Sequence, residues 1–255
     1  MIKYKTDEEI EIMQKGGKIL KDVLDLLVRE AKPGVTLLSL DTLAETEIRK
    51  RGAEPSFSKI PGYRWTTCLC LNDVVVHGIP TDYKLKAGDV LGIDVGVYLQ
   101  GFHTDTSWSI IVGDETGSRK ENQEKFKFLK KGEEALFKAL KEVKPGKRTW
   151  DISKVIQDTV EEGGYSVVRS LVGHGVGRDL HEDPEIPGFI KHAKSKTPEI
   201  KEGMVIAVEV IYNLGSPEVI YNTNDGWTIS TIDGKISGLF EKTVAVTSHG
   251  TLFLT

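Results

Sequence analysis

The sequence predicts an α+β protein built from two similar halves, each with two helices followed by antiparallel strands. Three observations support this prediction: four segments have helical apolar spacing, strand-like apolar runs lie between them, and two blocks of sequence repeat. We expect a single domain of 255 residues, with halves of approximately residues 1–115 and 116–255. The antiparallel strands would form a core sheet that the helices cover.

Four segments carry the apolar spacing of amphipathic helices. In the first, Thr6 and Glu9 have the arrangement of a capping box, in which each side chain accepts a bond from the other residue's backbone N–H. This helix is expected to end at Lys32-Pro33-Gly34, because proline does not continue a helix. The other three helices are predicted from about Ser39 to Lys50, from about Ser118 to Val143 and from about Trp150 to Glu162.

Strand-like segments fill most of the remaining sequence. Leu69 to Ile79 and Val90 to Val112 are rich in apolar and β-branched residues, and Gln100-Gly101 divides the second segment as a hairpin turn would. After Gly164, strand-like segments continue to the end of the chain, apart from a loop-rich stretch between His181 and Glu202. We therefore expect antiparallel pairing between neighbouring strands.

Two blocks of sequence recur in the same order. Lys32-Pro33-Gly34 returns as Lys144-Pro145-Gly146, at an offset of 112 residues. The segment from Leu85 to Val95 returns as Ile200 to Val210, at an offset of 115 residues, with an acid at the same place in an apolar run. Lys-Pro-Gly turns are common, so either block alone carries little weight. Together, the two blocks favour an internal duplication.

Composition narrows the class of protein. Hydrophobic residues make up 39% of the chain and charged residues 28%, which is ordinary for a globular protein, and the net charge of −4 does not favour DNA binding. The start of the chain is polar and has no apolar signal-peptide core, and the longest apolar run is too short for a membrane span. Cys68 and Cys70, one residue apart, do not form a disulfide framework. We expect a cytoplasmic monomer with reduced thiols.

Two acids interrupt apolar strands at matching places in the repeat. They are Asp94 and Glu209, each within a run of apolar residues. Burying a carboxylate is costly unless it is paired or bound to a metal. For Asp94 alone, a strand whose acid faces water is an adequate explanation. Glu209 has no polar alternation around it, so a bound cation is the better explanation there.

Two further acids are associated with these strands. If Gln100-Gly101 forms a two-residue turn, Asp105 lies opposite Gly96 and Asp94 is its diagonal neighbour on the same face, about 7–8 Å away. A shift of one residue in the register would separate the two carboxylates. In the second half, Glu241 opens an apolar strand. Each half therefore offers two carboxylates.

Histidines add donors of a second kind. His174 lies among glycines in Gly173-His174-Gly175, and glycine lets a backbone come close to a ligand. His181 follows seven residues later, and His77 ends another strand. A lone histidine is usually structural or exposed, which is our interpretation of the remaining three, His103, His192 and His249.

Four carboxylates and one imidazole form a ligand set for hard divalent metals such as Mn²⁺, Fe²⁺ or Co²⁺, and Zn²⁺ is also compatible. Two such ions can share a water molecule and lower its pKa to about 7, which gives hydroxide near neutral pH. We therefore expect two divalent metal ions as cofactors. The predicted reaction class is metal-assisted hydrolysis.

These residues lie in motifs that resemble those of the methionine aminopeptidases, which share the pita-bread fold with aminopeptidase P, prolidase and creatinase. The resemblance covers nearly the whole chain, and its specificity lies in five metal ligands in the right order. The motifs are Asn72 to Pro80, Asp94 to Gly96, Gly101 to Thr106, Gly173 to Arg178, His181 to Pro184, Asp225 to Thr228 and Phe240 to Thr243.

The resemblance implies a methionyl aminopeptidase, which removes the initiator methionine from nascent polypeptides when the second residue is small. It also implies that two metals are bound, with Asp105 and Glu241 bridging them and Glu209 assisting the attacking water as a general base. The implied metal ligands are Asp94, Asp105, His174, Glu209 and Glu241.

The resemblance further implies that His77 and His181 hold the scissile amide and stabilise its tetrahedral intermediate. The local candidates for a methionine pocket are Tyr63, Trp65, Cys68, Leu180 and Trp227. Many relatives have Phe at the position of Leu180, so we expect a wider pocket here. Only 34 residues separate His174 from Glu209, which is similar to the bacterial type I form and leaves no room for the insertion of type II enzymes.

Two other functions stay open at this point. One is a hydrolase of the same fold that acts on Xaa-Pro bonds, although such enzymes generally carry an additional N-terminal domain. The other is a non-catalytic relative that contacts ribosomes, although such proteins lose metal ligands. Residues 119–148 hold eleven Lys and Arg against five Asp and Glu. A solvated helix face explains this better, but transient ribosome contact is compatible with it.

Overall fold

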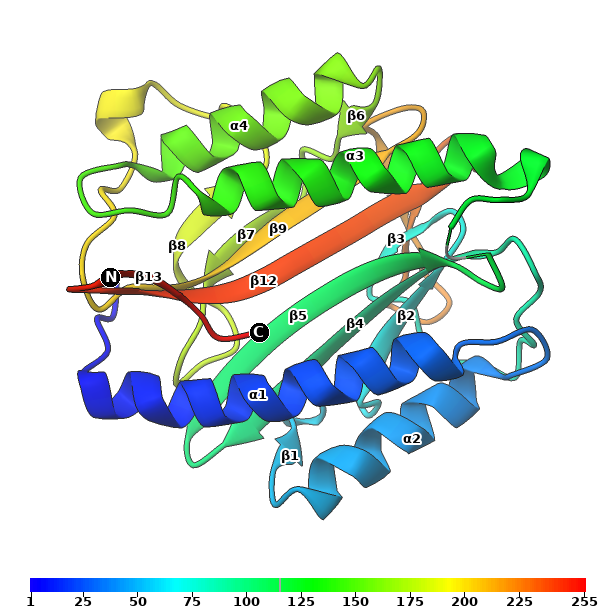
Figure 1. Ribbon diagram of the computed structural model, residues 1–255, viewed down its shortest axis with the longest axis horizontal. Helices are drawn as coiled ribbons and strands as arrows, with labels where there is room; N and C mark the ends of the chain where they lie inside the picture. Colours follow the sequence, from blue (N-terminus) through cyan, green and yellow to red (C-terminus); the bar gives the residue numbers. More distant parts are fainter. Residues whose placement is uncertain (115) are drawn as a thin grey trace.

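The computed structural model describes residues 1–114 and 116–255, so the predicted boundary between the halves, at residue 115, lies outside the described residues. Figure 1 shows the long helices in front of a sheet. These helices are α1 Asp7–Glu30, α2 Leu37–Lys50, α3 Gln123–Leu140 and α4 Thr149–Glu162. Three short 3-10 helices are η1 Phe57–Lys59, η2 Lys120–Asn122 and η3 Lys194–Lys196. Among the described helices, none has the length and apolar composition to cross a membrane.

In the part of the chain that the structure describes, ten strands form the main sheet. They are β1 Glu54–Pro55, β2 Thr67–Leu71, β4 Val90–Leu99, β5 Phe102–Ile111, β6 Ser166–Val167, β7 Val172–Gly175, β8 Glu182–Pro187, β9 Val205–Asn213, β12 Ser237–Thr247 and β13 Gly250–Phe253. Their order is β1-β4-β5-β12-β9-β7-β8, with β2 on β4, β6 on β9 and β13 on β12. A second, three-stranded sheet contains β3 Val74–Val76, β10 Val219–Tyr221 and β11 Ile229–Thr231.

The predicted helices are confirmed with small changes at their ends. The capping box at α1 is present, with 3.0 Å from the Thr6 N–H to the Glu9 carboxylate and 3.3 Å from the Glu9 N–H to the Thr6 hydroxyl. Helix α2 begins two residues earlier than predicted, because the Thr36 hydroxyl caps it. The predicted third helix is divided into η2 and α3.

One strand prediction was wrong in detail. Leu69 to Ile79 is not one strand, because Asn72 adopts a left-handed conformation with φ of 53° and turns the chain between β2 and β3. As a result, β3 pairs with β11 in the second sheet. The loop-rich stretch predicted between His181 and Glu202 also contains the short strand β8, which pairs with β7.

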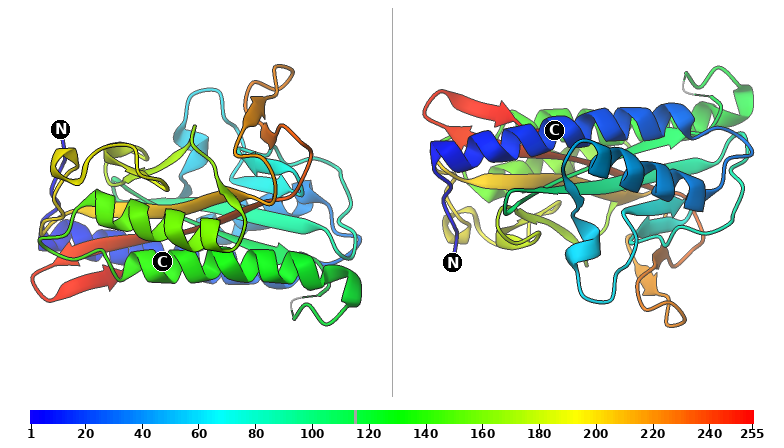
Figure 2. Two further views of the ribbon diagram at one scale, coloured as in Figure 1. Left: turned by 90° about the horizontal axis from the view of Figure 1, so that it is seen from above. Right: turned by 90° about the horizontal axis from the view of Figure 1, so that it is seen from below.

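The four α-helices α1 to α4 lie on one face of the main sheet, as the two edge-on views of Figure 2 show. Helices α1 and α2 cover the β4–β5 part, where a core cluster includes the fully buried Leu20, Leu40 and Ile93. Helices α3 and α4 cover the β9–β12 part, where a second cluster includes Phe128 and Ile156. The opposite face carries the η1 segment and the β10–β11 hairpin.

Candidate functional site

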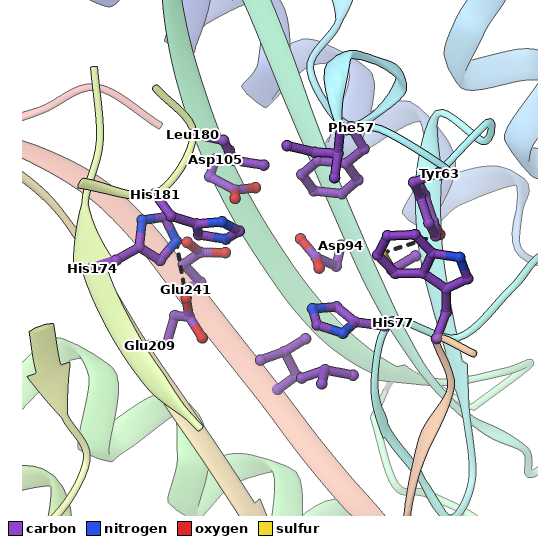
Figure 3. A pocket seen from close by; sticks show the side chains of 15 residues that line it. Phe57, Tyr63, His77, Asp94, Asp105, His174, Leu180, His181, Glu209 and Glu241 are labelled. Carbon is purple, nitrogen blue, oxygen red and sulfur yellow. Dashed lines mark hydrogen bonds and ion pairs between the residues drawn. The ribbon is translucent and has the colours of Figure 1, made fainter. Parts of the chain in front are cut away.

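A pocket lies over the middle of the main sheet, on the face away from the helices (Figure 3). It draws side chains from the central strands β4, β5, β12 and β9, and from the segments that flank them. Its lining residues are Phe57, Ile60, Tyr63, Cys68, Val76, His77, Asp94, Asp105, His174, Leu180, His181, Glu209, Trp227, Leu239 and Glu241. All five predicted metal ligands and both predicted substrate-binding histidines are therefore brought together.

The β4–β5 hairpin has the predicted register. Gln100 and Gly101 both have positive φ, 49° and 93°, which is the conformation of a two-residue type I′ turn. Gly96 pairs with Asp105, and Asp94 pairs with Ser107 two residues along the strand. Because residues two apart in a strand point to the same face, the Asp94 and Asp105 side chains lie on one side of the hairpin.

One row of paired residues crosses the four central strands. Asp94 of β4 pairs with Ser107 of β5, which pairs with Glu241 of β12, which pairs with Glu209 of β9. Directly paired residues in antiparallel strands point to the same face. The row therefore carries carboxylates from both halves of the chain across the middle of the sheet, with Asp105 beside it.

His174 enters from β7, next to β9. Its Nδ1 lies 2.9 Å from the Gly175 carbonyl, and a carbonyl only accepts, so Nδ1 carries the proton. The Nε2 atom is then the one that faces the acids, 3.3 Å from a Glu209 oxygen. A carbonyl bond that fixes the tautomer in this way is the usual support for a metal-binding histidine.

The glycines around His174 have a different purpose from the predicted one. A Cβ atom on Gly173 would lie 2.6 Å from the Ala207 carbonyl oxygen, and one on Gly175 would strike the Asp183 carbonyl. Both glycines therefore allow neighbouring strands to approach, rather than a ligand. This close packing brings the His174 ring toward the carboxylates of β9 and β12.

The carboxylates are placed where isolated charges would be unfavourable. Burial raises the pKa of Asp105 to about 7, and burial together with the neighbouring acids raises the pKa of Asp94 and of Glu241 well above the usual range. Within the described residues, Asp94 Oδ1, Glu241 Oε1 and the Ser107 hydroxyl are buried without a hydrogen-bond partner. Buried polar atoms are almost always satisfied, and a cation bound among these oxygens would supply the missing partner.

The donor set fits a divalent metal. Asp105, His174 and Glu241 each offer a ligand atom, and these atoms all lie within 4.8 Å of one another. Asp94 Oδ1 and Glu241 Oε1 supply the unsatisfied oxygens that a cation would use. Oxygen-rich sites with one imidazole suit the harder divalent ions.

Two further histidines flank the carboxylates. His77 follows β3 in a left-handed conformation, with φ of 56°, and Figure 3 shows its ring directed into the pocket. The His181 ring lies 4.5 Å from that of His174, centroid to centroid. Burial lowers the pKa of His77, and burial with the nearby His174 lowers the pKa of His181 to about 4. Both rings are neutral at pH 7, and a neutral ring can donate one hydrogen bond.

One end of the pocket is apolar. The Tyr63 and Trp227 rings meet edge to face, 5.0 Å apart, and the Tyr63 hydroxyl donates to the Thr67 carbonyl at 2.7 Å. Cys68 lies 3.2 Å from the same hydroxyl, and Leu180 completes this wall. Trp65 is not among the lining residues. It packs behind Tyr63, with 5.3 Å between the ring centroids.

Sequence reasoning missed four lining residues, Phe57, Ile60, Val76 and Leu239. Leu239 is two residues before Glu241 on β12, so the alternation of strand side chains could have identified it. Val76 directly precedes His77. Phe57 and Ile60 belong to the η1 segment, and nothing in their sequence pattern distinguishes them from ordinary core residues.

Comparison with known proteins identifies the family. The model of "Metallopeptidase family M24" matches residues 11–248. The methionine aminopeptidase of Clostridium perfringens is 43% identical over 255 residues, which cover 100% of this chain and 99% of the relative. A crystal structure of methionine aminopeptidase from Thermotoga maritima superposes with a TM-score of 0.92 at 39% identity, covering 100% of this chain and 99% of that one.

More distant structures share the fold alone. The prolidase from Pyrococcus horikoshii superposes with a TM-score of 0.76 at 24% identity, and the match covers 99% of this chain but only 63% of the prolidase. The α+β architecture expected from the sequence, with antiparallel strands covered by helices, is thus the pita-bread fold that these enzymes share. The match covers 99% of the two methionine aminopeptidases but 63% of the prolidase, and this difference separates the two groups of relatives. The chain belongs to metallopeptidase family M24 and, within it, to the methionine aminopeptidases.

Proposed function

We propose that this chain removes the N-terminal methionine of nascent polypeptides by hydrolysis, using two divalent metal ions. The observation that carries this proposal is the convergence of five potential ligands from both halves beside an apolar pocket. The residues that would hold the ions are Asp94, Asp105, His174, Glu209 and Glu241. Bound there, the ions would supply Lewis acidity for activating water.

The chain's own residues would complete the reaction. Glu209 lies beside His174 with its side chain partly exposed to the pocket, so it is our candidate for accepting a proton from water. His77 and His181, both neutral at pH 7, would donate hydrogen bonds to the scissile amide and to the oxygen on which negative charge develops. For this role, each histidine needs a fixed ring orientation and one ring N–H that donates.

The methionine side chain would occupy the apolar end of the pocket. Tyr63, Cys68, Leu180 and Trp227 provide a wall of aromatic, sulfur and aliphatic groups, which suits a flexible thioether. Trp65 supports Tyr63 from behind rather than contacting the side chain. An apolar pocket end also favours an uncharged side chain over a charged one.

Cleavage of short peptides tests the proposal. The metal-loaded protein should release methionine from Met-Ala-Ser, and a chelator should abolish this release until Mn²⁺ or Co²⁺ is restored. An Xaa-Pro peptide should be cleaved poorly under the same conditions. Efficient cleavage of the Xaa-Pro peptide, with Met-Ala-Ser untouched, would instead establish a prolidase-like function.

Location and partners follow from the substrate. Nascent chains are made in the cytoplasm, and Cys68 and Cys70 are free and buried as expected there. We expect a monomer, measurable by light scattering. Ribosome contact through residues 119–148 is a separate prediction. Some of the positive charge there is already paired, since Lys130, Lys131 and Lys138 form ion pairs with glutamates on α3. Loss of ribosome pelleting after Lys→Glu changes at exposed positions there would support contact, and unchanged pelleting would count against it.

A further inference from the structure

The connection between β7 and β8 carries Leu180 and His181, so its conformation decides where the His181 ring lies. Its backbone is bonded at three points. The Val176 N–H donates to the Val205 carbonyl, the Gly177 N–H to the Asp179 carbonyl, and the His103 N–H to the Gly177 carbonyl, at 3.1, 3.1 and 2.7 Å. Glu182, directly after His181, pairs with Gly175 of β7, so the sheet holds that end of the connection, and side-chain contacts supply the rest.

Those contacts come from the start of the chain. Each of the four charged residues from Arg178 to Asp183 forms an ion pair with a residue between Met1 and Glu9. The pairs are Arg178 with Glu9, Asp179 with Lys3, Glu182 with Lys5, and Asp183 with the Met1 amino group. The first nine residues therefore lie along the segment that contains His181.

Only one of the four pairs is buried. The Lys5 and Glu182 side chains are 3% and 1% exposed, with 2.6 Å between Nζ and Oε2, whereas Lys3 and Asp179 are 50% and 66% exposed. Exposed ion pairs contribute little to stability, because water and salt screen them. Removing one member of a buried pair leaves the other charge without a partner, which is strongly unfavourable.

Lys5 and Glu182 are fixed on both sides. The Lys5 N–H donates to the Gly203 carbonyl at 2.7 Å, and its ammonium also donates to the Lys3 carbonyl at 3.0 Å. Glu182 accepts the Asp179 N–H on its other oxygen, at 3.2 Å. A Cβ atom on Gly177 would lie 2.8 Å from Lys5 Nζ, so the segment packs directly on the lysine.

We propose that Lys5 and Glu182 are positioning residues for His181, so that the N-terminal segment of the chain holds a substrate-binding histidine in place. Glu182 is the next residue after His181 and the first of β8. Its carboxylate also accepts the backbone N–H of Asp179, which lies two residues before His181. The buried Lys5–Glu182 pair is thus bonded to the segment both before and after His181. The proposal rests on the function proposed above for His181.

A double-mutant cycle tests this inference in the full-length, metal-loaded enzyme. The variants are Lys5→Met, His181→Ala and both together, assayed on Met-Ala-Ser. Misplacing a reacting group by about 1 Å can cost roughly 10²-fold in rate, so Lys5→Met should lower kcat by roughly 10- to 100-fold. In the His181→Ala background the same change should cost nothing further, because the group that Lys5 positions is gone. Affinity for Co²⁺ should be unchanged in Lys5→Met.

The matched control is Lys3→Met, which removes the exposed pair with Asp179 and a longer contact of 3.7 Å with Glu182. It leaves the buried Lys5–Glu182 pair in place, so kcat should stay within twofold of the wild type. If Lys5→Met does not fold, Lys5→Met with Glu182→Leu removes both buried charges and should restore folding. That double variant should show the same loss of kcat.

The outcomes separate the two proposals. A loss of kcat that adds fully to that of His181→Ala would overturn the positioning role, as would wild-type kcat in a folded Lys5→Met or Lys5→Met/Glu182→Leu variant. Wild-type activity in His181→Ala would overturn the function proposed for His181, and the positioning role with it. A loss in Lys5→Met that disappears in the His181→Ala background would support both.

Discussion

The two halves of the sheet share a pattern of strand pairing but differ in the side chains that it carries. Glu54 pairs with Tyr98 in the first half, and Ser166 pairs with Asn213 in the second, at the offsets of 112 and 115 residues that the sequence repeat has. The turns match too, since the Gly34 and Gly146 N–H groups bond the carbonyls of Leu85 and Ile200. These matches support our proposal that the halves arose by duplication of one unit.

The side chains at matching positions diverge. Asp94 pairs with Ser107, whereas its counterpart Glu209 pairs with Glu241. The other acid of the first half, Asp105, pairs with Gly96, two residues away from the position that Glu241 has in the second half.

The neighbouring strands differ in the same way. Cys70 pairs with Gly92 in the first half, and at the matching place His174 pairs with Ala207 in the second half. The backbone repeats, but the second half supplies the imidazole and the first half supplies a thiol that is not part of the pocket lining. A repeated backbone frame with different side chains at its matching positions thus produces an asymmetric site.

The largest effect is expected at Asp105, an acid that has no counterpart at the matching position of the second half. Asp105→Ala should abolish turnover, because the carboxylate proposed to be shared between the two ions is lost. The measurement is kcat on Met-Ala-Ser at saturating metal, with circular dichroism to confirm folding. Most of the activity surviving in a folded, metal-loaded variant would rule out the shared-ligand role.

The second prediction concerns the histidines and the position that matches His174 in the first half. His181→Ala should bind metal normally but lose roughly 10²–10³ in kcat, as expected for one hydrogen-bond donor to a developing oxyanion. His174→Ala should weaken metal binding, with partial rescue at high metal concentration. The matched control Cys70→Ser, with or without Cys68→Ser, should retain turnover. Calorimetric titration with Mn²⁺ decides between the roles, and equal loss of affinity in both histidine variants would show that His181 is itself a ligand.

Much of this asymmetric site could be predicted from the sequence, because local rules determine it. The Gln100-Gly101 turn fixed the β4–β5 register, and acids inside apolar strands identified Asp94 and Glu209. The rest depends on contacts between distant parts of the chain. Pairing of β3 with β11 and the Lys5–Glu182 pair join residues more than a hundred positions apart, and no local pattern records them.

Metal affinity should depend on pH because of the crowded acids. Burial raises the pKa of Asp105 to about 7, so below that pH the metal-free carboxyl holds a proton that an ion must displace. Affinity for Mn²⁺ should therefore rise between about pH 6 and pH 8, with release of protons on binding. Calorimetry in two buffers of different ionisation enthalpy measures that release. Affinity that stays constant across this range would mean that the acids are already ionised without metal.

The smallest effect is expected at the apolar end of the pocket. Trp227→Ala removes part of the wall, and such a change typically alters discrimination by about 1–3 kcal/mol. The preference for Met over Leu or norleucine at the first position should weaken, measured as a ratio of kcat/KM values. Preference for a small second residue should persist, because it concerns the other side of the scissile bond. A change in second-residue preference alone would place Trp227 outside the methionine pocket.

We propose that the two halves of the chain together hold a pair of metal ions. The number of ions required for turnover is the most direct test of this proposal. Metal-free protein would be titrated with Mn²⁺ while bound metal and release of methionine from Met-Ala-Ser are measured on the same samples. We expect two ions to bind per chain in the wild type and activity to rise until both are present. Full activity with a single bound ion, and no second binding step, would contradict it.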